Sequence, residues 1–122
     1  MGIVRGVCLI TERVPDLTAF YADLLDAKAN GDDRHASLDI GGMHVTFAHL
    51  SIMEEMAPGS LKGAGHGSFT LDIEVADVDA VFERVGEGSA SVVKPPQSYP
   101  WGTRSLWLRD PDGNIVNLFQ RV

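Results

Sequence analysis

Two stretches of this sequence resemble each other closely: VPDLTAFYADL at residues 14–24 and VADVDAVFERV at residues 75–85. They lie 61 positions apart (75 − 14) in a chain of 122 residues, so the offset is half the chain. When they are superposed, Asp16 meets Asp77, and apolar or aromatic residues coincide along both copies. A repeat of this length indicates one supersecondary unit that occurs twice.

Each copy predicts one helix with a strand before it. Asp16 and Asp77 are of a type that caps helix N-termini, and the apolar residues after them recur every three or four positions. Before the second helix, residues 68–75 (SFTLDIEV) alternate polar and apolar side chains, which is typical of a half-buried strand. Residues 3–10 (IVRGVCLI) occupy the same place before the first helix.

Three more strands are predicted after each helix. The turns between them are Gly41-Gly42 in the first copy and a longer Asp-Pro-Asp-Gly-Asn turn at residues 110–114 in the second. The chain therefore reads βαβββ twice. The six strands are expected at residues 27–30, 35–40, 43–50, 91–95, 103–108 and 114–120.

A single βαβββ unit cannot close its own sheet, so the two copies should pack side by side. We expect an α+β fold of tandem βαβββ modules that form a half-open, cupped mixed sheet with two helices outside. The first module should span residues 1–50 and the second residues 67–122. Residues 51–66, which include Pro58 and several glycines, are expected to be a linker.

Composition and charge exclude several classes of protein. With 44% hydrophobic residues the chain has an ordinary globular composition, and its one cysteine suits a reducing cytoplasm. No apolar run approaches the roughly 20 residues that span a bilayer. A net charge of −7 argues against binding to a nucleic-acid backbone. We therefore expect a cytoplasmic protein with no nucleic-acid or membrane partner.

Tandem βαβββ modules with the motif RDPDGN (residues 109–114) resemble the vicinal oxygen chelate superfamily, and the resemblance spans nearly the whole chain. This superfamily includes glyoxalase I, extradiol dioxygenases, and fosfomycin- and bleomycin-resistance proteins. The resemblance implies a homodimer. In metal-dependent members, four residues on the first and last strands of each module hold the metal. Carried over to this sequence, and with the repeat used for the first module, these positions fall on Leu9, Thr46, Thr70 and Asn117.

None of these four residue types is a good ligand for zinc, nickel or iron. The resemblance therefore implies a degenerate metal site and no cofactor. A shift of one position would bring in Cys8, although a lone thiol with no histidine partner makes a poor site. A displaced set for Zn, Ni, Fe or Mn is the alternative, built from Asp39, His44 and Glu74. Asp39 and His44 also fit a solvated cross-strand pair.

Strand periodicity predicts a pocket on the face that the helices leave open. That face should carry small polar residues and an aromatic pair, the usual make-up of a small-molecule site. Residues 95–104 (PPQSYPWGTR) read as a proline-rich loop that adds flat stacking surface. The residues expected to bind ligand are Thr46, Thr70, Tyr99, Trp101, Trp107, Asn117 and Phe119.

Three functions remain open from the sequence. The first is a binding protein of the bleomycin-resistance kind, not an enzyme, that sequesters a small aromatic or cationic molecule without a metal. The second is a metal-dependent lyase, isomerase or dioxygenase with a displaced ligand set. The third is a metal-free enzyme in which Asp72 or Glu74 acts as acid or base.

Overall fold

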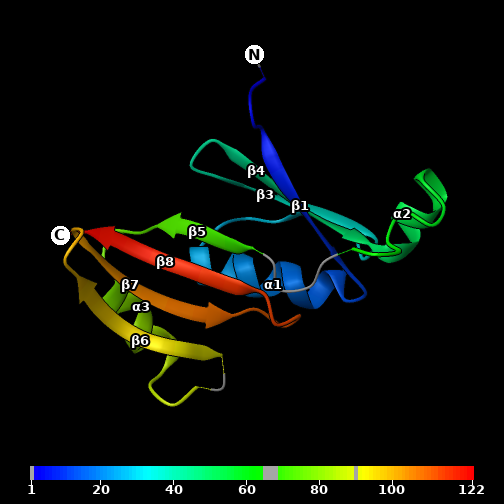
Figure 1. Ribbon diagram of the computed structural model, residues 1–122. Helices are drawn as coiled ribbons and strands as arrows, with labels where there is room; N and C mark the ends of the chain where they lie inside the picture. Colours follow the sequence, from blue (N-terminus) through cyan, green and yellow to red (C-terminus); the bar gives the residue numbers. More distant parts are fainter. Residues whose placement is uncertain (1, 65–68, 90) are drawn as a thin grey trace. The chain divides into compact units, whose positions relative to one another are not determined.

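The computed structural model describes residues 2–64, 69–89 and 91–122, which belong to two compact units, Met1–Gly65 and His66–Val122 (Figure 1). Each unit contains one four-stranded mixed sheet. The strand and helix order within each unit confirms the predicted α+β class and the tandem βαβββ modules. No helix in the described ranges is both long and apolar enough to cross a membrane.

The first unit has strand order β1-β4-β3-β2, with β1 parallel to β4 and the other pairs antiparallel. Helix α1 packs on β3 and β4, where Tyr21 stacks on Phe47 with ring centres 5.6 Å apart. This side of the sheet is the core of the unit. Its elements are β1 (Gly6–Thr11), α1 (Val14–Leu25), β2 (Asn30–Gly31), β3 (His35–Ile40), β4 (Met43–His49) and α2 (Leu50–Met56).

Helix α2 lies where a linker was predicted over residues 51–66. It begins at Leu50, and the Nδ1 atom of His49 accepts a hydrogen bond from the Ser51 amide at 3.1 Å, which caps its first turn. The helix was not predicted because it has no buried residue and so no apolar pattern that marks a packed face. The last two residues of the predicted linker lie outside the described residues.

The second unit repeats the arrangement, with strand order β5-β8-β7-β6 and β5 parallel to β8. Helix α3 lies against one face of this sheet (Figure 1). The residues packed there are fully buried, namely Val78, Leu106, Leu108, Val116 and Leu118. The elements are β5 (Thr70–Glu74), α3 (Val78–Val85), β6 (Val92–Tyr99), β7 (Thr103–Arg109) and β8 (Ile115–Arg121).

Strand β6 is longer than predicted. Residues 95–104 read as a loop, yet β6 continues through Pro95 and Pro96 as far as Tyr99. Prolines are tolerated because β6 is the edge strand, and the pairing with β7 shifts register on both sides of Lys94. Such irregularities bend a strand and redirect its side chains. Only residues 100–102 form the turn into β7.

The Asp-Pro-Asp-Gly-Asn turn is organised by the buried Asp110. Its carboxylate accepts hydrogen bonds from the Asp112 and Asn114 amides, both at 2.9 Å, and from the Asn114 side chain at 2.8 Å. Arg109 donates to the Gly113 carbonyl at 2.9 Å, so it steadies the turn. These contacts fix the hairpin that carries β8.

Arg104 ties β7 to α3 on the helix-covered face. Its Nε and Nη2 atoms donate to the two carboxylate oxygens of Asp79, each at 2.8 Å. The hydrogen bonds from this guanidinium lower the pKa of the Asp79 carboxyl below its ordinary value. Arg104 therefore points away from the open face of the sheet.

Equivalent elements of the two modules lie farther apart in the chain than the sequence repeat suggested. Helices α1 and α3 begin at Val14 and Val78, which are 64 positions apart (78 − 14), so the superposition at 61 is slipped by about one helical turn. Asp77 caps α3 by accepting from the Asp79 and Ala80 amides at 3.1 and 3.2 Å. The prediction that Asp16 also caps a helix is wrong, because Arg13 occupies the N-cap position of α1 and Asp16 lies within the first turn.

We expect Asp77→Ala to lower the free energy of unfolding of the second unit by about 1 kcal/mol, because two helix amides lose their acceptor. Asp16→Ala is the matched control. It removes only a favourable charge near a helix N-terminus, so its loss should be smaller, roughly 0.3 to 0.5 kcal/mol. Urea unfolding followed by circular dichroism measures both. Equal losses would contradict the different roles of the two aspartates.

Candidate functional site

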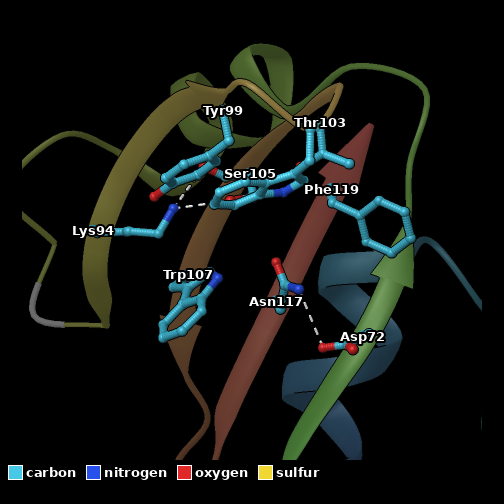
Figure 2. A pocket seen from close by; sticks show the side chains of 9 residues that line it. Asp72, Lys94, Tyr99, Thr103, Ser105, Trp107, Asn117 and Phe119 are labelled. Carbon is cyan, nitrogen blue, oxygen red and sulfur yellow. Dashed lines mark hydrogen bonds between the residues drawn. The ribbon is translucent and has the colours of Figure 1, made fainter. Parts of the chain in front are cut away.

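A pocket of about 560 Å³ lies on the open face of the second sheet, opposite α3 (Figure 2). The pleat brings its residues together, because alternate side chains of β5, β7 and β8 point away from the helix. The curved edge strand β6 and the turn after it close one side. The lining residues are Asp72, Lys94, Tyr99, Trp101, Thr103, Ser105, Trp107, Asn117 and Phe119.

Aromatic rings form one wall of the pocket. Tyr99 and Trp101 stack nearly parallel, with ring centres 4.6 Å apart and 8° between their planes. Trp101 remains 72% exposed, so much of its indole is available to another molecule. Trp107 and Phe119 supply further aromatic surface, and both are only half-buried. Both tryptophans of the chain line this pocket.

Lys94 projects from β6 across the aromatic wall (Figure 2). Its ammonium lies 4.7 Å from the centre of the Tyr99 ring and 5.4 Å from that of Trp107. It donates to the Ser105 hydroxyl at 2.8 Å and to the Ser105 carbonyl at 3.3 Å. Aromatic faces attract a cation, and the two hydrogen bonds fix its position. The lysine is thus held in place at one end of the pocket.

A carboxylate marks the other end. Oδ1 of Asp72 accepts from the Thr70 hydroxyl at 2.8 Å and from the Asn117 side-chain amide at 3.1 Å. The amide Nδ2 of Asn117 therefore turns towards Asp72, and its Oδ1 turns away (Figure 2). That oxygen is buried and has no hydrogen-bond partner within the described part of the chain. Asn117 is thus an amide whose nitrogen has a hydrogen-bond partner and whose buried oxygen has none among the described residues.

The structure brings together five of the seven residues expected to bind ligand: Tyr99, Trp101, Trp107, Asn117 and Phe119. Thr70 is not among the lining residues, but its hydroxyl donates a hydrogen bond to Asp72, which is. Thr46 lies on β4 of the first unit, beside Cys8 of β1, and is not part of this pocket.

Sequence reasoning missed Lys94 as a member of the site. Lys94 lies in the predicted strand 91–95, but strand alternation could not say which face it occupies because β6 changes register on both sides of it. Thr103 was also missed, although it shares strand parity with Ser105 and Trp107. Asp72 was considered only as an acid or base.

The residues at the family's metal positions do not fit a metal. The offset of 64 positions makes Gly6, not Leu9, the counterpart of Thr70, and Leu9 is buried beside Phe47. Gly6 has no side chain, and a Cβ there would overlap the carbonyl oxygen of His44. With Thr46, Thr70 and Asn117 at the other three positions, no imidazole, thiolate or carboxylate is present.

The displaced ligand set is divided between the two units. The side chains of Asp39 and His44 meet at 2.7 Å across their hairpin in the first unit, and both are largely exposed. Glu74 belongs to the second unit, where Arg121 lies 3.3 Å from it. Among residues 2–64, 69–89 and 91–122, no three His, Cys, Asp or Glu side chains form a group that could hold a metal.

Comparison with known proteins agrees with this architecture. The model of the Glyoxalase/Bleomycin resistance protein/Dioxygenase superfamily matches residues 4–118. The uncharacterized protein YraH of Bacillus subtilis (strain 168) is 27% identical over 110 residues, covering 84% of this chain and 86% of its own.

The uncharacterized protein Rv0887c of Mycobacterium tuberculosis (H37Rv) is 30% identical over 125 aligned positions, covering 93% of this chain and 72% of its own. Among solved structures, a glyoxalase/bleomycin resistance protein/dioxygenase family enzyme from Burkholderia phytofirmans PsJN superposes with a TM-score of 0.85. It covers 99% of this chain and 100% of its own at 18% identity, so it supports the fold alone.

Gly6→Ala should destabilise the first unit by about 1 to 3 kcal/mol, because the added methyl group forces β1 away from β4. Gly2→Ala is the control, since a Cβ there would meet no described atom within 4 Å. Thermal unfolding of both variants measures the difference. If Gly6→Ala were as stable as the unaltered protein, β1 and β4 would not approach so closely, and a side chain could occupy this metal position.

Proposed function

This chain belongs to the Glyoxalase/Bleomycin resistance protein/Dioxygenase superfamily, and within it we propose a metal-independent binding protein that captures a planar small molecule on its second sheet. The observation that carries the proposal is the pocket itself. Both tryptophans, a tyrosine and a phenylalanine share it with a few hydrogen-bonding groups. A volume of about 560 Å³ falls within the range of small-molecule sites, roughly 300 to 1,000 Å³.

The proposed mechanism is stoichiometric capture by stacking and hydrogen bonding. Trp101 presents an exposed indole that Tyr99 already holds by stacking, so binding costs little side-chain entropy there. Trp107 and Phe119 offer further rings for the ligand to contact. Asn117 and the carboxylate of Asp72 supply the hydrogen-bonding groups of the pocket wall.

Metal independence is supported by the chemistry of the residues at the family positions. Two threonines, an asparagine and a glycine offer no ligand that zinc, nickel, iron or manganese prefers. A metal-dependent lyase, isomerase or dioxygenase would need the displaced set of Asp39, His44 and Glu74. The first two form a solvent-exposed pair with each other, and Glu74 has an arginine partner.

A metal-free acid–base function would have to rest on Asp72. Its carboxylate lines the pocket, whereas Glu74 is not among the lining residues. Oδ1 of Asp72 already accepts two hydrogen bonds, from Thr70 and Asn117, which orients the group. The same contacts suit a carboxylate that receives a donor from a bound ligand. Capture without reaction therefore accounts for Asp72 with fewer assumptions.

Trp107→Ala should raise the Kd for the neutral fluorescent probe N-phenyl-1-naphthylamine about tenfold, because a ring of the pocket wall is removed. Phe69→Ala is the matched control, since Phe69 is an exposed aromatic residue of the same unit that does not line the pocket. Fluorescence titration of each protein, with and without EDTA, measures the Kd. Loss of probe binding in EDTA, or equal binding by the Trp107 variant, would contradict the proposal.

A further inference from the structure

We infer that this pocket selects planar ligands that carry an anionic group, and that Lys94 is the residue that selects them. The inference rests on the proposed function and names the ligand class for the same site. Lys94 is the one cationic residue among the nine that line the pocket. It stands beside the aromatic rings on which a planar ligand would stack.

The ammonium of Lys94 has spare hydrogen-bonding capacity. It carries three N–H donors, of which two are directed to the hydroxyl and the carbonyl of Ser105. Both acceptors are uncharged, and within the described ranges no carboxylate lies within ion-pair distance of Lys94. By contrast, Arg34, Arg104 and Arg121 each pair with a carboxylate.

Lys94 lacks a carboxylate partner although the chain has 17 acidic and 10 basic residues and a net charge of −7. Acidic partners are plentiful, yet the acid in the pocket, Asp72, accepts hydrogen bonds from Thr70 and Asn117 instead. The pocket therefore has a positive end and a negative end. A ligand with an anionic group at the Lys94 end would give the lysine the charged partner that the protein does not supply.

The aromatic wall argues in the same direction. A cationic ligand would seek the ring faces of Tyr99 and Trp107, but the ammonium of Lys94 already lies over both rings. The positive charge of Lys94 would also repel a cationic ligand. A carboxylate or sulfonate on an aromatic skeleton could instead accept a charge-assisted hydrogen bond from Lys94 while its ring stacks on Trp101. The expectation of a basic ligand is thus replaced, at this end of the pocket, by that of an acidic one.

Two fluorescent probes test this inference. 1-Anilinonaphthalene-8-sulfonate and N-phenyl-1-naphthylamine have the same ring skeleton, and only the first carries a sulfonate. Because both tryptophans line the pocket, energy transfer from tryptophan to the probe reports binding near this site. We expect the sulfonate to bind the unaltered protein roughly tenfold more tightly than the neutral probe, the effect of one charge-assisted hydrogen bond.

Lys94→Met should abolish this preference, so that the ratio of the two dissociation constants falls from about ten to about one. Lys94→Arg should retain most of the preference, since the charge remains. Lys28→Met is the control, an exposed lysine outside the pocket that should change neither affinity. Thermal unfolding of each variant verifies that it is folded before titration.

The outcomes distinguish selection of anionic ligands by Lys94 from the capture of planar molecules in general. Equal affinity for the two probes, or a sulfonate preference that survives Lys94→Met, overturns the inference and leaves capture of planar molecules standing. Failure of both probes to bind overturns the proposed function and the inference with it. A preference that depends on Lys94 and not on Lys28 supports both.

Discussion

The pleat of the second sheet is the constraint on which the site depends. Because successive side chains point to opposite faces, burying Leu106, Leu108, Val116 and Leu118 under α3 commits their neighbours to the other face. Ser105, Trp107, Asn117 and Phe119 are those neighbours. The same alternation that builds the core therefore assembles the pocket, and a slip of one residue in register would destroy both.

The edge strand gives the site its charge. Pro95 and Pro96 cannot donate hydrogen bonds to the sheet, and β6 accommodates them by changing register on either side of Lys94. Lys94 lies opposite Trp107 in this pairing, with its ammonium against Ser105. A short loop in place of these residues would leave the pocket open on that side. The irregular strand instead supplies both a wall and a cation.

Apart from α2 and the full length of β6, the elements of the fold could be predicted from the sequence, but the alignment of its two halves could not. Apolar residues on a helix recur every three or four positions, so sliding one copy by a turn preserves the pattern. Asp16 and Asp77 therefore seemed equivalent, although only Asp77 caps its helix. The slip had a functional consequence, because it placed a metal position on the buried Leu9 instead of Gly6.

Most residues of the pocket could be predicted from the alternation of side chains along each strand, which depends on local sequence alone. Trp107, Asn117 and Phe119 were assigned to the open face on that basis. Lys94 was not, because its role depends on how an edge strand bends around two prolines, and that is decided by pairing with β7. Thr46 belongs to β4 of the first unit and is not among the residues that line this pocket, because strand parity alone does not say which of the two sheets carries a pocket.

The most direct test of metal-independent capture is an amide-correlation NMR titration of the protein with 1-anilinonaphthalene-8-sulfonate in the presence of EDTA. The two tryptophans give two indole N–H signals, and both arise from the pocket. We predict that the largest shifts occur at these signals and at the backbone amides of Lys94 and Asn117. Shifts centred on Asp39 and His44, or shifts that appear only after a divalent metal replaces the chelator, would contradict capture at the second sheet.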